Sequence, residues 1–181
     1  MAQEASFIHT SDLHLNGNKD RFEVLSNIVS LCLKRKVDAL LIAGDLFDKN
    51  ASRKTVYLAY KKLDLLKDEG VRVFLIKGDE DARVKLSKIP LHIKLLKNKG
   101  VNSFSLKNRP IGLYHGLINN HMAKSKFDYF ALGHFHDCTR INAHCYYSGS
   151  PIPSLKYKIK QRYVILVTFK GKKIKPIRIK L

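Results

Sequence analysis

The feature that most constrains the fold is a short apolar run, DALLIA at positions 38–43, in which every residue after the first is apolar. A strand that has no polar face must be covered on both sides, which is typical of a central strand in a parallel sheet. Mostly apolar runs also occupy positions 5–9 and 71–76, and segments with helical spacing of apolar residues separate the three. This order of strand, helix, strand, helix and strand predicts a layered α/β fold.

Local signals place the other elements. Asp20 and Glu23 have the spacing of a capping box, and Ser52 can cap a second helix that ends at Gly70. In the second half, residues 91–96 suggest a short helix, and Gly171 with its flanking lysines predicts a hairpin turn. We expect strands at 101–104, 111–114, 129–132, 143–147, 163–169 and 174–179, and we expect the last three to be antiparallel.

Length and composition favour one compact globular unit. At 181 residues the chain fits a single domain, which we expect to span residues 1–181. No stretch approaches the ~18 apolar residues that cross a bilayer, and the first residues do not resemble a secretory signal. We therefore expect a cytoplasmic protein without a membrane partner. Its three cysteines, at positions 32, 138 and 145, are expected to be reduced.

The charge is strongly basic and unevenly distributed. Lysine and arginine total 34 against 15 acidic residues, which gives a net charge of +19. From Ser154 to Leu181 there are ten basic residues and no acidic one. Such a field attracts polyanions, of which nucleic acids are the commonest, although a solubilising surface is the alternative explanation. Among these residues we select Lys170, Lys172 and Lys173 as predicted nucleic-acid contacts.

Side chains that bind metals gather directly after the apolar runs. In a parallel sheet the carboxyl ends of the strands meet at one edge, which is where α/β folds place their sites. Carboxylates together with imidazoles suit Mn²⁺, Fe²⁺ or Zn²⁺. A single histidine or aspartate after a strand is more often a structural hydrogen bonder, but the ordered set favours a metal site. The predicted ligands are Asp12, His14, Asp45, Asp79, His115, His134 and His136.

The spacing of the ligands adds a geometric expectation. Residues two apart in an extended segment point the same way, so Asp12 with His14, and His134 with His136, are each expected to grip one site. Two such ions roughly 3.5–4 Å apart can activate a water molecule and hold a phosphate oxygen. Gly44 would let the backbone turn tightly beside the ions.

The motifs HTSDLHLNG, LLIAGDLFDKN, FLIKGDED, YHG, ALGHFH and YYSGSP occur in this order between His9 and Pro151. In this combination the chain resembles the calcineurin-like metallophosphoesterase superfamily, and within it the SbcD-type exonucleases of DNA repair. The resemblance implies an αββα sandwich with mixed sheets and antiparallel C-terminal strands. It also implies in-line attack of water on phosphorus.

The resemblance assigns roles residue by residue. It implies two divalent ions, with Mn²⁺ preferred and Fe²⁺, Zn²⁺ and Ni²⁺ as alternatives. Asp45 would bridge them, and Asp48 would orient the catalytic residue at position 80. The first ion would be held by Asp12, His14, Asp45 and His136, and the second by Asp45, Asp79, His115 and His134.

The third motif departs from the family pattern. The family reads Gly-Asn-His-Asp, whereas this chain reads GDED at positions 78–81. Asp79 can still bind a metal, but Glu80 cannot act as a cationic hydrogen-bond donor. It donates a proton only if its pKa lies well above ~4.3, and loss of a general acid typically costs 10²–10⁴-fold in rate.

The chain is also short for the SbcD branch. Only 35 positions separate Glu80 from His115 (115 − 80), so we expect no separate DNA-binding cap domain. The resemblance implies nucleic acid, DNA before RNA, an SbcC-type ATPase and a homodimer as partners, but no docking segment for the ATPase is visible. The leading prediction is a metal-dependent phosphodiesterase of nucleic acid. The alternatives are a small-molecule phosphodiesterase or phosphatase, and a catalytically weakened module that binds DNA or a protein.

Overall fold

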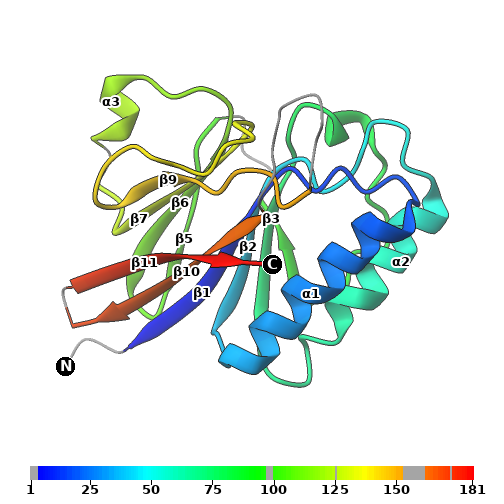
Figure 1. Cartoon of the computed structure of the whole chain (residues 1–181), viewed down its shortest axis with the longest axis horizontal. Helices are drawn as coiled ribbons and strands as arrows, with labels where there is room; N and C mark the ends of the chain where they lie inside the picture. The colour runs from blue at the N-terminus through cyan, green and yellow to red at the C-terminus, as the bar shows by residue number, and fades with distance from the viewer. Residues whose placement is uncertain (1–3, 97–99, 125, 153–161, 172) are drawn as a thin grey trace.

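The structure is a computed structural model that describes residues 4–96, 100–124, 126–152, 162–171 and 173–181. Two mixed β-sheets pack against each other, and helices α1 (Lys19–Arg35) and α2 (Arg53–Asp64) cover the outer face of the first sheet (Figure 1). The short helix α3 (Asn120–Ala123) lies on the outer side of the second sheet. The predicted layered α/β fold with mixed sheets is confirmed.

The first sheet has six strands, four of them parallel. The strands β1 to β4 run in one direction, β10 pairs antiparallel with β1, and β11 pairs antiparallel with β10. The two C-terminal strands are therefore antiparallel, as predicted. In spatial order the strands are β11 (Lys173–Lys180), β10 (Tyr163–Lys170), β1 (Ala5–Thr10), β2 (Ala39–Ala43), β3 (Arg72–Ile76) and β4 (Ile93–Leu95).

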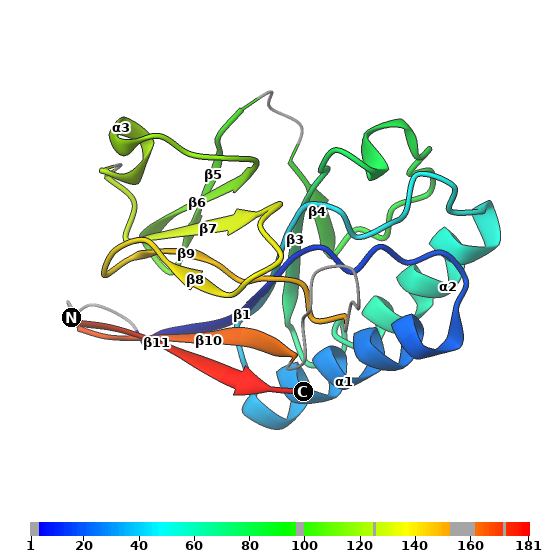
Figure 2. The same cartoon turned by 45° about the horizontal axis from the view of Figure 1, so that its top comes forward.

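The second sheet has five strands and carries one correction. The prediction that the strand at 143–147 is antiparallel is wrong with respect to its longer neighbour, because β9 pairs parallel with β7 and antiparallel only with the two-residue β8. In spatial order the strands are β5 (Asn102–Leu106), β6 (Arg109–His115), β7 (Tyr129–Gly133), β9 (Cys145–Tyr147) and β8 (Thr139–Arg140). Figure 2 shows this sheet beside the first.

Two apolar layers hold the sandwich together. One lies between the helices and the first sheet and includes Ile8, Leu40 and Val73, none of which has exposed surface. The other lies between the sheets, where Phe7 meets Tyr129 edge to face at 5.2 Å between ring centres. Because alternate residues of β1 to β3 face opposite layers, both faces of these strands are apolar, and the uninterrupted run of β2 is explained.

Two further corrections concern the ends of helices, and a third concerns the type of an element. Helix α1 begins after Asn18, whose side chain accepts a hydrogen bond from the Asp20 N–H, so the expected capping box at Asp20 is wrong. Ser52 does cap α2, accepting from the Thr55 N–H, although the helix ends at Asp64 rather than at Gly70. The short helix expected at 91–96 is strand β4, which pairs parallel with β3.

The three cysteines are free thiols. Within the described ranges, none of the helices is long and apolar enough to cross a membrane.

Candidate metal centre

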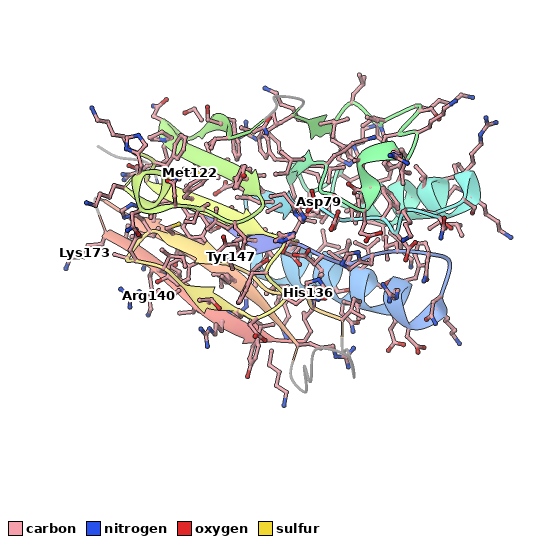
Figure 3. The ribbon with its side chains drawn as sticks, turned by 90° about the horizontal axis from the view of Figure 1, so that it is seen from above. Asp79, Met122, His136, Arg140, Tyr147 and Lys173 are labelled. Atoms are coloured by element: carbon pink, nitrogen blue, oxygen red, sulfur yellow. The ribbon has the colours of Figure 1, made fainter. Side chains whose placement is uncertain are left out.

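The predicted ligands lie where the carboxyl edges of the two sheets meet. Asp12 and His14 follow β1, and Asp45 and Asp79 follow its parallel neighbours β2 and β3. From the second sheet, His115 ends β6, and His134 and His136 follow the parallel strand β7. Asp79 and His136 both lie toward the centre of the molecule seen from above (Figure 3). Parallel pairing in both sheets therefore brings distant segments to one place.

One cluster consists of Asp12, His14 and His136. Asp12 Oδ1 lies 4.0 Å from His14 Nε2 and 3.8 Å from His136 Nε2, and the two imidazole nitrogens are 3.4 Å apart. Asp12 is fully buried. The side chains of His14 and His136 are 17% and 21% exposed, so this cluster is largely shielded from water.

A second cluster consists of Asp79, His115 and His134. Asp79 Oδ2 lies 3.0 Å from His134 Nδ1 and 3.7 Å from His115 Nε2. Unlike the first cluster it is open to solvent, because the side chains of Asp79 and His134 are 70% and 41% exposed. The second ion site is thus the more accessible of the two.

Asp45 links the clusters. Its Oδ2 lies 3.2 Å from His115 Nε2, and with Asp12 and His115 it forms a third group of mutually close ligand atoms. The other oxygen, Oδ1, accepts hydrogen bonds from the Glu80 N–H at 2.9 Å and the Asp81 N–H at 3.4 Å. One carboxylate oxygen is therefore fixed by the main chain, while the other faces the ligand atoms.

The ionisation of these groups fits a site for cations. Burial raises the pKa of Asp12, and the positive charges of nearby histidines oppose this effect. Within the described chain no hydrogen-bond donor reaches the buried Asp12 Oδ1. A buried carboxylate oxygen without a donor is costly unless a cation compensates it. The donor set of carboxylates and imidazoles suits a divalent transition metal, so the residues present fit the implied ions.

His115 and Asp45 form a tightly coupled pair. Although burial disfavours the protonated ring, the hydrogen bond and charge of Asp45, together with the charge of Asp12, raise the pKa of His115 to about 9. Burial likewise disfavours the Asp45 carboxylate, yet its contacts with His115 and with the Glu80 N–H lower the pKa of Asp45. Without metal, an imidazolium at His115 thus balances part of the negative charge.

The backbone at the ligands is left-handed rather than extended. Asp12, His14, Asp45 and His134 have φ angles of 56°, 47°, 50° and 91°. Asp12 and His14 share one cluster, as expected, although their backbone is not extended. The expectation that His134 and His136 grip one site is wrong, because they belong to different clusters. Strained conformations of this kind in non-glycine residues gather at functional sites.

A tight approach at Gly78 explains why this position carries no side chain. A Cβ atom there would overlap the carboxylate of Asp45 and lie 2.7 Å from the Asp45 main-chain nitrogen. Atoms that are not bonded do not approach so closely, so any side chain at position 78 would displace the linking ligand.

Several residues that support the ligands were not predicted from the sequence. The Ser11 hydroxyl donates to Asp12 Oδ2, and Arg21 Nη1 donates to the His14 carbonyl oxygen at 2.6 Å. Asp81 is fully buried and accepts hydrogen bonds from the main-chain N–H groups of Gly78 and Phe47, at 2.8 and 3.3 Å. In the sequence, Ser11 and Asp81 are polar residues inside the motifs and Arg21 is a basic residue just after one of them. Such residues are common near any motif, so their type alone did not mark them as supports of the ligands.

The predicted catalytic residues line the same cleft as every predicted ligand except His115. The cleft has a volume of about 770 Å³, and Asp48 and Glu80 are among its lining residues. Asp48 Oδ1 accepts a hydrogen bond from the Asn50 N–H, the Asp48 N–H donates to the Leu15 carbonyl oxygen, and the Glu80 N–H donates to Asp45 Oδ1. The catalytic roles of both residues stay predictions.

The predicted nucleic-acid contacts lie at the opposite edge of the first sheet. Lys170 and Lys173 are exposed at the ends of β10 and β11, and Lys172 lies outside the described residues. Because β10 is antiparallel to β1, Phe169 pairs with Ala5 at the start of β1, whereas the ligand Asp12 follows its end. Lys173 accordingly lies far from Asp79 in Figure 3.

Comparison with known proteins identifies relatives by sequence. The DNA double-strand break repair protein Mre11 of Sulfurisphaera tokodaii is 30% identical over 95 residues, which cover 48% of this chain and 24% of Mre11. The uncharacterized metallophosphoesterase YhaO of Bacillus subtilis is 23% identical over 202 residues, which cover 75% of this chain and 50% of YhaO. The chain thus spans half or less of the length of these curated relatives.

A solved structure shows the same fold over the whole chain. The structure of a novel archaeal phosphodiesterase superimposes with a TM-score of 0.67 at 13% identity, covering 96% of this chain and 99% of that one. The sequence model of calcineurin-like phosphoesterases matches residues 5–158. This match includes every predicted metal ligand, and the chain therefore belongs to the calcineurin-like phosphoesterase family.

Proposed function

We propose that the chain hydrolyses phosphodiesters with two divalent metal ions and that its substrate is nucleic acid. The observation that carries the proposal is the pair of three-residue clusters linked by Asp45. Family membership supports a metal-dependent phosphoesterase in general. When bound, two ions supply a Lewis acid for a phosphate oxygen and lower the pKa of a bound water. Mn²⁺ is the proposed metal.

The residues of the chain would each contribute in a definite way. Asp12, His14 and His136 would hold one ion in a buried setting, and Asp79, His115 and His134 would hold the other at the cleft. The Glu80 main chain fixes Asp45 between them. Glu80 itself lines the cleft and is the proposed side chain for moving a proton near the substrate.

The first experiment is hydrolysis of bis-p-nitrophenyl phosphate by the purified protein with added Mn²⁺, beside the variant Asp45→Ala. Activity that disappears in the variant supports the proposal, because Asp45 forms the third group of ligand atoms together with Asp12 of one cluster and His115 of the other. Absence of activity in a wild-type protein that binds two ions would refute it.

The nucleic-acid part of the proposal rests on the basic surface and on Mre11 as a relative. The six-residue strand β1 separates Lys170 from the ligands, which is ~20 Å at 3.3 Å per residue. In a duplex, at 3.4 Å per base pair, roughly six or more base pairs would reach both places. We therefore expect Lys170→Glu with Lys173→Glu to weaken binding of a 20-base-pair duplex and to flatten its salt dependence.

A matched pair of charge changes separates a local contact from a general loss of charge. Lys61 and Lys62 are exposed on α2, so Lys61→Glu with Lys62→Glu alters the net charge equally at another surface. Equal weakening by both pairs, measured by fluorescence anisotropy over a salt series, would contradict a specific contact at Lys170 and Lys173.

Two other functions have specific support. The first is a small-molecule phosphodiesterase or phosphatase, for which the fold shared with a compact archaeal phosphodiesterase, covered almost completely by this chain, is the support. The replacement of asparagine and histidine by Asp79 and Glu80 supports a metal-binding module with weakened activity. A nuclease should hydrolyse longer oligonucleotides faster than dinucleotides, whereas a small-molecule phosphodiesterase should not. A protein that binds two metal ions but hydrolyses neither kind of substrate would be the metal-binding module.

A further inference from the structure

A second cleft adjoins the metal cleft and shares the lining residue Asp79 with it. It has a volume of about 730 Å³ and is lined by residues from the ends of β3, β4 and β6 and from the segment between β3 and β4. Asp79 lines both this cleft and the cleft that contains Asp48 and Glu80, and His115 lines the second cleft as well. A phosphate held at the exposed second cluster is therefore accessible from both clefts.

The two clefts differ in chemistry. The metal cleft is lined by six acidic side chains and by the cations Arg21 and Lys49. In the second cleft Asp79 is the single acid among the described lining residues, against the cations Lys77, Arg83 and Lys85. Most of its remaining wall is aliphatic, formed by Ile76, Val84, Leu86, Ile89, Leu95 and Leu96. The Tyr114 ring adds an aromatic side chain.

The aliphatic wall is anchored in the fold. Lys77 Nζ donates to the Ala82 and Val84 carbonyl oxygens at 2.9 and 2.6 Å. These bonds hold the segment that follows β3 against the end of that strand. Leu86 and Ile89 pack against the core between the helices and the first sheet, yet both remain partly exposed. Their exposed surface therefore faces a cavity whose walls are already in place.

We propose that this cleft binds the nucleoside part of a substrate whose phosphate lies at Asp79 and His115. The inference rests on the proposed phosphodiesterase function and names the group that flanks the phosphate. A nucleobase is flat and uncharged, and it gains affinity by contact with apolar and aromatic surfaces. The exposed cations Arg83 and Lys85 match the next phosphate of a strand. An inorganic phosphate would leave the aliphatic wall uncovered.

Binding of two small probes tests the proposal directly. Isothermal titration calorimetry of the Mn²⁺-loaded protein would compare thymidine 5′-monophosphate with inorganic phosphate. We expect the nucleotide to bind about tenfold more tightly, since one stacked base contributes about that much or more. Leu86→Glu should remove the preference because it places a carboxylate in the apolar wall. Leu65→Glu, at an exposed leucine just after α2, should keep it.

Phosphate affinity serves as the internal measure of folding. Leu86 and Ile89 both touch the core, so Ile89→Glu provides an independent second variant in the same wall, judged by the same phosphate affinity. Loss of nucleotide affinity with wild-type phosphate affinity, in either variant, supports the nucleoside cleft. The proposal is overturned if the wild type shows no preference for the nucleotide, or if both variants keep the wild-type affinity for the two probes. A nucleotide preference without hydrolysis of bis-p-nitrophenyl phosphate would refute the phosphodiesterase and leave the cleft assigned.

Discussion

Replacing His9 by asparagine should remove a defined part of the pH dependence of folding stability. His9 is fully buried in β1, and its Nδ1 lies 2.9 Å from the Tyr129 hydroxyl oxygen. Burial lowers the pKa of His9 from 6.5 to about 3, and the main chain of Leu132 opposes this effect only in part. Between these values the unfolded chain binds a proton that the folded chain does not. Stability contributed by the neutral ring is therefore present above pH 6.5 and is lost as the pH falls toward 3.

The magnitude follows from the two pKa values. With 6.5 in the unfolded chain and about 3 in the folded chain, His9 lowers the free energy of unfolding by about 2 kcal/mol between pH 7 and pH 5. Asparagine keeps a polar atom near the position of Nδ1 but does not bind a proton in this range. Urea unfolding followed by circular dichroism, in EDTA to exclude metal-linked protons, should show a pH dependence about 2 kcal/mol smaller in His9→Asn.

Comparison of slopes, rather than of absolute stabilities, makes this test specific. His9→Asn also changes packing, but a change in packing shifts the free energy of unfolding at pH 7 and at pH 5 by the same amount. His121→Asn, at an exposed histidine of α3, should keep the wild-type pH dependence. An unchanged difference between pH 7 and pH 5 in His9→Asn would mean that His9 is not buried as a neutral ring, and the packing of Tyr129 on β1 would then be wrong.

Two further predictions concern the metal centre. Arg21→Met should weaken one Mn²⁺ site about tenfold in calorimetry, because the charge-assisted hydrogen bond to the His14 carbonyl, worth about 1.5–3 kcal/mol, holds that residue at a φ of 47°. Arg35→Met at the other end of α1 is the control, and equal affinities in both variants would refute the role of Arg21. Mn²⁺ binding at pH 7 should release about one proton from His115, whose pKa is about 9 without metal, since a metal ligand must be neutral. Identical apparent enthalpies in buffers of different ionisation enthalpy would contradict this.

The position of the site could be predicted because it depends on strand order alone. Each ligand follows an apolar run, and parallel strands end at one edge, so Asp12, Asp45 and Asp79 converge whatever the details of their loops. Strand β4 could not be predicted in the same way. Residues 91–95 alternate apolar and polar side chains as a strand does, but so short a segment does not exclude a helical turn, and pairing with β3 decides the structure.

The local geometry of the ligands depends on contacts that no spacing rule contains. His134 and His136 are two residues apart, but the φ of 91° at His134 turns it toward Asp79 while His136 lies with Asp12. The His134 N–H donates to Asp12 Oδ2, which fixes this turn through a residue 122 positions away. A sequence pattern shows which residue types are present, whereas such a division between clusters follows from long-range hydrogen bonds.

The third motif determines the charge of the loaded centre. Three aspartates and two divalent ions sum to +1 (4 − 3), and Glu80 beside them brings the sum to zero. Asp79→Asn with Glu80→His would raise it to +2 with a neutral histidine. The Asp79 side chain is 70% exposed, so solvent weakens this effect, and we expect the KM for bis-p-nitrophenyl phosphate to fall only about threefold.

The rate constant separates the two interpretations of Glu80. If the natural motif lacks a proton donor, the double variant should raise kcat by about 10² or more, because a histidine would supply general acid catalysis. If kcat falls instead, Glu80 performs a catalytic step that histidine cannot replace. Mn²⁺ affinity should decrease in either case, since the cluster at His115 and His134 loses a carboxylate. The natural loop would then favour retention of metal over attraction of the phosphodiester.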